Sequence, residues 1–186
     1  MACIVDKRRL KIESQLGAFP VYDFRWIETS QIDFTQKVRT VCEMNDCGMY
    51  GKRWVCPPAI GSVQACIQRA QSYPKAFIFS TVAELSDAYY FDASLKSRKM
   101  HEDVTYRIKE IFETVYPDVY VLSTGCLTCP SCTYPEASCR HPDMAFSTIE
   151  SHGIHIMQLA KQLDMDFDIG PQMVVYFSII FYSTEA

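Results

Sequence analysis

Four closely spaced cysteines constrain this chain more than any other feature of its sequence. Cys126, Cys129, Cys132 and Cys139 are separated by two, two and six residues in the segment GCLTCPSCTYPEASCRHP. Three thiols at successive two-residue intervals wrap a tight loop, so their sulfurs can converge on adjacent corners of a cubane, as in ferredoxin-type sites. The spacing therefore predicts an iron–sulfur cluster with four cysteine ligands.

A structural zinc site is the alternative for this segment. Four thiolates suit zinc, but the usual layout is two C-x2-C pairs separated by a longer spacer. Three cysteines within seven residues are awkward for one tetrahedral ion. The fourth cysteine also follows at six residues and lacks the proline that ends the ferredoxin pattern. The pattern favours iron–sulfur over zinc and leaves zinc open.

A second cysteine motif lies nearer the start of the chain and contains only three thiols. Cys42, Cys47 and Cys56 are spaced by four and eight residues, and two prolines follow Cys56. A cubane held by three thiolates leaves one iron free for a substrate, a small ligand or another side chain. Catalytic metal sites keep such an open position, whereas structural sites are closed. Cys66 falls on the apolar face of an expected helix, where a buried free thiol is the preferred interpretation.

The loop between Cys47 and Cys56 carries the residues YGKRW. Lys52 and Arg53 would offset the negative charge of a thiolate-bound cluster, or bind an anionic substrate. Tyr50 and Lys52 are therefore the candidate catalytic residues beside the open position. The alternative makes Lys52 a solvated loop charge and Trp54 a core anchor, and for Trp54 we favour the anchor. The histidines at 141, 152 and 155 are expected in surface or packing roles rather than as ligands.

Composition restricts the compartment and the partners. The 186 residues include nine cysteines, an odd number that suits metal ligation better than complete pairing. The basic cluster at 7–9 follows a short apolar piece, the reverse of a secretory signal, so we expect the cytoplasm, where thiols stay reduced. A net charge of −4 argues against a nucleic-acid binder, and no apolar run is long enough to span a membrane.

Hydrophobic periodicity predicts one domain, 1–186, of α/β or α+β class, with a central mixed sheet flanked by helices. Cysteine-rich loops would occupy 42–58 and 126–142. Strands are expected at 19–27, 76–82, 119–122 and 173–182. Helices are expected after Asp33, from Ser62 to Pro74, over about 92–115, and over about 147–163 with a break at Gly153. The last strand is either a buried sheet centre, which we favour, or an edge that pairs with a second subunit in a homodimer.

The two motifs together resemble a known family. The patterns CxxxxCxxYGKxWxCPP and CxxCxxCxxPxxxCRxP, followed by STIESHGIHIMQLAK, are similar to an uncharacterised family of predicted metal-binding proteins, a domain of unknown function found largely in anaerobic bacteria and archaea. The similarity runs from Cys42 to the last helix. It implies that the seven cysteines of the two motifs are ligands. It also implies that five further residues belong to the pattern: Tyr50, Lys52, Trp54, Arg140 and Glu150. The resemblance implies no reaction.

Three functions are compatible with these observations. The first is a redox protein with two [4Fe-4S] clusters: a closed electron relay at 126–139 and a cluster with an open iron at 42–56, serving a redox partner protein or a small-molecule substrate. The second is a non-redox enzyme that uses the open iron as a Lewis acid or sulfur acceptor. The third is a zinc-stabilised binding module. No nucleotide-binding glycine motif is present.

Overall fold

The fold is built on a five-stranded mixed sheet within residues 6–85 and 90–184, the part of the chain that the computed structural model describes. The strand order is β1-β2-β5-β3-β4. The strands are β1 (Asp23–Glu28), β2 (Lys75–Glu84), β3 (Val119–Ser123), β4 (Ser147–Thr148) and β5 (Met173–Tyr182). Neighbours pair antiparallel except β3 and β4, which run parallel. The expected mixed sheet flanked by helices is confirmed, and β5 lies in its interior between β2 and β3.

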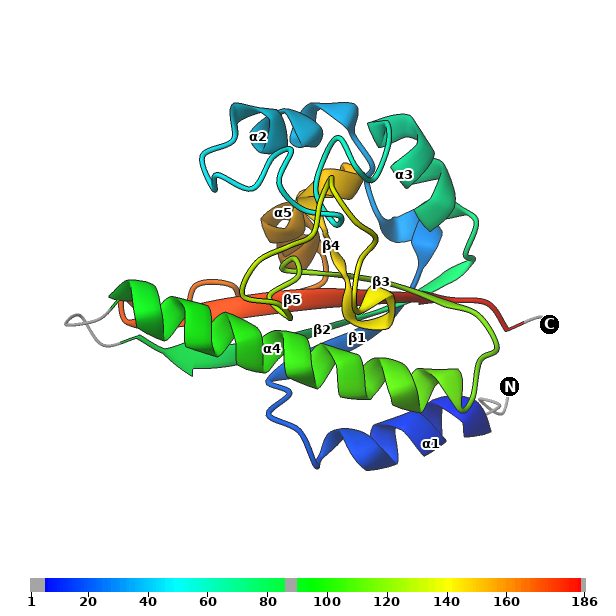
Figure 1. Ribbon diagram of the computed structural model, residues 1–186. Coiled ribbons are helices and arrows are strands. Elements are labelled where there is room, and N and C mark those ends of the chain that lie inside the picture. Colours follow the sequence, from blue (N-terminus) through cyan, green and yellow to red (C-terminus); the bar gives the residue numbers. More distant parts are fainter. Residues whose placement is uncertain (1–5, 86–89, 185–186) are drawn as a thin grey trace.

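Helices cover both faces of this sheet (Figure 1). On one face lie α1 (Lys7–Leu16) and α4 (Tyr90–Glu113), whose Ile12, Ile108 and Phe112 pack against inward residues of β2 and β5. On the other face lie α3 (Val63–Gln71) and α5 (Ile156–Gln162), with α2 (Arg39–Met44) above them. Side chains of β2 alternate between the two cores, because successive residues of a strand point to opposite faces. No helix in the described residues is long and apolar enough to cross a membrane.

The first helix was not expected from the sequence. The side chain of Asp6 caps it by accepting the backbone N–H of Arg8 at 3.0 Å. The strand expected at 19–27 begins only at Asp23, since residues 17–20 form the turn that leaves α1. A strand assignment for Phe19 is therefore wrong.

Two other expectations need correction. Asp33 does not cap a helix, because the next helical element is a 3-10 turn at Gln36–Val38 that begins after Thr35. The backbone N–H of Thr35 donates to the carbonyl of Gly153 at 2.8 Å. The stretch 147–163 is not one interrupted helix, because its first two residues join the sheet as β4. A 3-10 turn at Glu150–His152 and the left-handed Gly153 (φ 75°) then precede α5. By contrast, the Ser62 cap of α3 and the buried Cys66 are confirmed.

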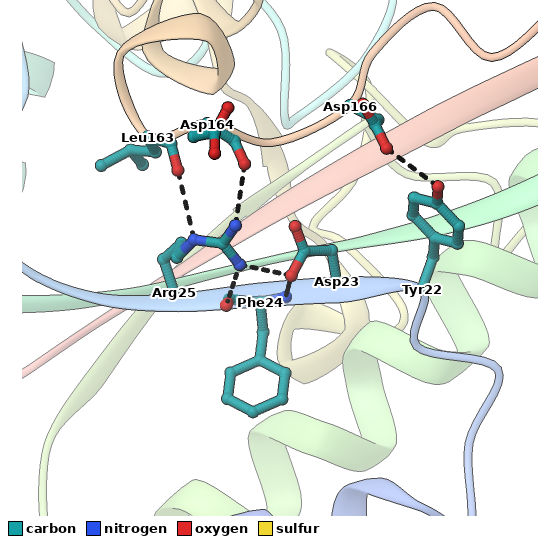
Figure 2. Close-up of polar contacts among 7 residues, drawn as sticks. All are labelled: Tyr22, Asp23, Phe24, Arg25, Leu163, Asp164 and Asp166. Carbon is teal, nitrogen blue, oxygen red and sulfur yellow. Dashed lines mark hydrogen bonds and ion pairs between the residues drawn. The ribbon is translucent and has the colours of Figure 1, made fainter.

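Polar contacts fasten the segment after α5 to the sheet edge (Figure 2). The guanidinium of Arg25 donates to the carbonyls of Leu163 at 3.2 Å and Asp164 at 2.8 Å, and it also pairs with Asp23. The Tyr22 hydroxyl donates to Asp166 at 3.0 Å. These bonds fix the return of the chain towards β5.

Candidate metal centre

The second cysteine loop leaves the sheet directly from β3. Gly125, just before Cys126, has φ 95°, a conformation that favours glycine. A Cβ there would lie 3.1 Å from Cγ2 of Thr148 and 3.3 Å from Nη2 of Arg98. The loop therefore starts in tight contact with both β4 and α4, so the position of Cys126 is set by the sheet.

The four thiols of this loop line one small cavity. Arg53 and Arg140 line the same cavity, so it combines a thiol-rich wall with two cationic side chains. The cysteines that line it are Cys126, Cys129, Cys132 and Cys139. The predicted quartet is thus brought together by the fold. Within residues 6–85 and 90–184, however, no group of three or more His, Cys, Asp or Glu side chains is placed to hold a single metal ion.

Cys132 lies in surroundings that favour its thiolate. Burial raises the pKa of this thiol, but hydrogen bonds from the backbone of Tyr134 and Trp54, together with the charge of Arg53, outweigh burial and hold the pKa below its usual value. A thiolate is the form that binds metals. The local backbone therefore prepares this sulfur for ligation.

The three thiols of the first loop also lie close enough to affect one another. Cys42 lies in α2, Cys47 follows α2 and is exposed, and Cys56 is buried beside Pro57. Burial, and after it the charges of Cys47 and Cys42, raise the pKa of Cys56 to about 11. Burial likewise raises the pKa of Cys42, with Cys47 adding to it. Such mutual repulsion is relieved when a cation binds between thiolates, so the trio is suited to a metal group.

Glu150 is the acidic neighbour of this trio. Its charge raises the pKa of Cys42, next in importance after burial. The contact arises because α2 is fastened to the turn that begins at Glu150: the Arg39 guanidinium donates to the carbonyl of Ser151 at 2.7 Å. Reasoning from the cysteine spacing alone did not find this carboxyl. Its only signal in the sequence was membership of the family pattern.

The two cysteine loops meet through the YGKRW segment. The Arg53 guanidinium donates to the carbonyl of Cys126, and the Trp54 indole N–H donates to the carbonyl of Ala137 at 3.0 Å. The Trp54 ring also packs edge-on against Tyr134, with centroids 4.9 Å apart. Trp54 is half-buried between the loops, so the expectation that it is a core anchor is wrong. It joins the loops instead.

The remaining candidate residues lie apart from these contacts. Lys52 is exposed on the first loop, and the backbone N–H of Tyr50 donates to Oδ1 of Asn45 at 2.9 Å. Catalytic roles for both residues stay predictions. His152 is buried and hydrogen-bonded to the Tyr120 hydroxyl, and Nδ1 of the exposed His155 accepts the backbone N–H of Gln158 in α5 at 3.3 Å. The buried position of His152 agrees with the expected packing role, and His155 lies at the surface, where its capping bond was not expected.

Fold and site together define an α+β protein in which two thiol-rich loops meet above one face of a mixed sheet. Residues 25–182 match the family model described as "Predicted metal-binding protein (DUF2284)", and since this match spans most of the sequence, the chain belongs to that family. The resemblance drawn from the cysteine motifs is confirmed. No curated protein and no solved structure matches the chain. Metal binding is therefore supported at the level of the family, and the metal is not identified by it.

Proposed function

We propose that the protein is a redox protein that binds two [4Fe-4S] clusters, one in each cysteine loop. The observation that carries this proposal is the convergence of four thiols on one cavity. The closed site would be held by Cys126, Cys129, Cys132 and Cys139, and the open site by Cys42, Cys47 and Cys56. When bound, such clusters accept and return single electrons, and an iron without a thiolate can take an external ligand.

The residues around the closed site would tune it for electron transfer. Arg53 lies at the cavity wall and donates to the Cys126 carbonyl, so its charge offsets that of the thiolates. Backbone N–H groups directed at Cys132 stabilise negative charge on sulfur in the same way. Both effects favour the reduced state, because reduction adds negative charge to the site.

At the open site, Glu150 would supply the fourth contact. Its carboxyl acts on the Cys42 thiol, and carboxylates are regular ligands of iron. Tyr50 and Lys52 are retained as candidates for contacting a substrate at the same site. The loop contacts through Trp54 and Arg53 support transfer of electrons between the two sites, because they hold the loops against each other.

Metal analysis tests this proposal. Protein reconstituted anaerobically should contain about eight irons and eight sulfides per chain, and the reduced protein should give two interacting paramagnetic resonance signals. Cys129→Ala should remove one cluster and Cys56→Ala the other. Cys66→Ala is the matched control, because Cys66 is as buried as Cys56 but belongs to neither motif. Four irons or fewer in the wild-type protein would refute the two-cluster assignment.

A zinc-stabilised binding module is the second candidate, and the size of the cavity favours it. The cavity between the four thiols measures about 20 Å³, room for about one water molecule, so a single ion would need less movement of the loop than a cubane. Colourless protein with stoichiometric zinc after anaerobic purification would select this candidate. Strict anaerobiosis matters because zinc occupies thiolate sites once a cluster is lost. Iron-loaded protein that dithionite cannot reduce would instead favour non-redox chemistry at the open iron.

A further inference from the structure

A row of polar side chains runs through the interior between α4 and the sheet. The Thr81 hydroxyl lies 2.8 Å from Nδ1 of His101, and Nε2 of His101 lies 2.8 Å from the Ser178 hydroxyl. The Ser178 hydroxyl lies 2.6 Å from that of Ser123, which donates to Oε1 of Glu102 at 2.6 Å. All five residues are buried. Such a row is costly in a core unless its members satisfy one another.

Glu102 is the ionisable end of this row, and its two oxygens differ. Oε1 accepts three hydrogen bonds: from the Ser123 hydroxyl, and from the backbone N–H (2.9 Å) and hydroxyl (2.6 Å) of Thr124. Oε2 is buried and has no hydrogen-bond partner within the described structure. A buried carboxylate oxygen without a donor is destabilised as an anion. Oε2 is therefore the atom on which a proton can settle without displacing an existing bond.

The position of Glu102 links it to the second cysteine loop. Thr124, which donates twice to Oε1, precedes Cys126 by two residues. The Arg98 guanidinium donates to the Thr124 hydroxyl at 3.2 Å and to the Gly125 carbonyl at 3.3 Å. The carboxyl is thus tied by the backbone and by Arg98 to the start of the loop.

Glu102 also lines a cavity of about 290 Å³, so its side chain borders a space large enough for water, although Oε2 itself is buried. Leu127 and Thr128 of the cysteine loop form part of the wall. The other ionisable groups there are Lys99, Asp103 and Tyr106, all from α4. From the strands, the Ser123 hydroxyl on β3 donates to Glu102, and Ser178 on β5 lies behind it in contact with Ser123. The segment before β4 contributes Met144 and Phe146 to the cavity wall.

Burial, hydrogen bonds and the charge of one arginine determine the pKa of Glu102. Burial raises the pKa of Glu102, while the Ser123 and Thr124 hydrogen bonds and the Arg98 charge lower it. An additional negative charge in the neighbouring loop favours the protonated carboxyl, because like charges disfavour ionisation. Asp103, next in sequence, lines the same cavity but is exposed, so solvent screens it.

We propose that Glu102 takes up a proton at Oε2 when the site formed by Cys126, Cys129, Cys132 and Cys139 gains an electron. The inference rests on the proposed function of that site. One electron comes from a low-potential one-electron donor, one proton comes from water in the cavity, and one O–H bond forms at Oε2. Oxidation returns the electron to an acceptor and the proton to the cavity. Glu102 thereby keeps the charge of the buried region constant during the redox cycle.

The test measures the midpoint potential of the iron-loaded protein, poised with dithionite, from about pH 6 to about pH 9. One proton per electron lowers the potential by about 59 mV per pH unit, which is a tenfold change in the one-electron equilibrium. The wild type should approach this slope over part of the range. Glu102→Gln, which keeps the shape and the accepting oxygen, should abolish the slope, while Asp103→Asn should preserve it.

Infrared difference spectra keep the inference testable if Glu102→Gln does not fold. Reduced-minus-oxidised spectra of the wild type should gain a carbonyl band of a protonated carboxylic acid, shifted in D₂O. A pH-independent potential, or a slope retained in Glu102→Gln, would overturn the inference while leaving the clusters in place. Protein that binds no iron after reconstitution would overturn the proposed function and the inference together, and the iron assay distinguishes these outcomes.

Discussion

Replacing Arg39 by lysine tests how the first cysteine loop is held on the fold. Arg39 is only 5% exposed, and its guanidinium donates to the carbonyls of Ser151 at 2.7 Å and Gly61 at 2.8 Å. The first bond joins α2, which carries Cys42, to the turn that carries Glu150, and the second joins α2 to the segment before α3. A lysine keeps the charge but has a single nitrogen in place of the planar fork, so it cannot span both carbonyls.

The expected loss follows from these contacts. A hydrogen bond from a charged donor contributes about 1.5–3 kcal/mol, and lysine retains at most one of the two. We therefore expect Arg39→Lys to lower the free energy of unfolding by about 1.5–3 kcal/mol. With a urea dependence of about 2 kcal/mol per molar, the midpoint of unfolding falls by about 1 M.

Urea unfolding of the chelator-treated protein measures this effect without interference from loss of a metal group. Arg107→Lys is the matched control: Arg107 is an exposed helical arginine, and its replacement should change stability by no more than about 0.5 kcal/mol. In reconstituted protein, Arg39→Lys should also release iron from the first loop faster than from the second. A stability change for Arg39→Lys no larger than that of the control would refute the role assigned to the two carbonyl bonds.

Three further predictions follow from the geometry. Gly125→Ala should destabilise the fold by about 1–3 kcal/mol and lower iron retention in the second loop, because φ is 95° and the added Cβ would lie 3.1 Å from Thr148. Urea unfolding and iron analysis measure the two effects, and the absence of both would contradict the prediction. Trp54→Phe removes the 3.0 Å bond to the second loop and should speed proteolysis there, with unchanged digestion as the contrary result. Burial lowers the pKa of His101 and of His152 to about 4. Between about pH 6.5 and about pH 4 the unfolded chain therefore binds protons that these histidines do not bind in the folded chain. The free energy of unfolding should decrease as the pH is lowered through this range, by up to about 2.7 kcal/mol per pH unit for the two histidines together. A flat pH profile from urea unfolding would exclude neutral buried histidines.

Local sequence was a good guide where the pattern was long and strongly apolar. The strands over 76–82 and 173–182 and the long helix near 92–115 lie close to their observed positions, because runs of β-branched and aromatic residues or a sustained helical stripe leave few alternatives. Helix α1 was not expected because half of KRRLKIESQL is charged and the helix buries only Ile12 and Leu16. Its stability depends on packing against α4, which no local pattern reveals.

The segment after the second cysteine loop was misjudged for a related reason. Residues 147–163 have a helix-compatible pattern, yet Ser147 and Thr148 pair with Leu122 and Ser123 as a parallel strand. Strand pairing with β3 overrides the weak local preference, since tertiary context routinely outweighs propensity. Parallel pairing between segments far apart in sequence leaves no short-range signal.

The cysteines of the candidate site were predictable from the sequence, and the residues around them were not. Spacing identified the cysteines, because a cluster motif is a local pattern in the chain. Arg98 and Glu102 come from α4, where nothing in the local sequence associates them with cysteines. Glu150 comes from a 3-10 turn, and only the family pattern indicated it. Only the folded arrangement places Glu102 behind the second loop and Glu150 beside the first.

Two arginines make the cysteine loops one electrostatic unit. The charge of Arg53 lowers the pKa of Cys56 in the first loop and of Cys132 in the second, although burial is the larger influence on each thiol. The charge of Arg98 acts on Cys56 as well, and its guanidinium holds the Gly125 carbonyl at the start of the second loop. In the proposed two-cluster protein, a change to either arginine would therefore shift the potentials of both sites, and an electron at one loop would disfavour reduction of the other because like charges repel.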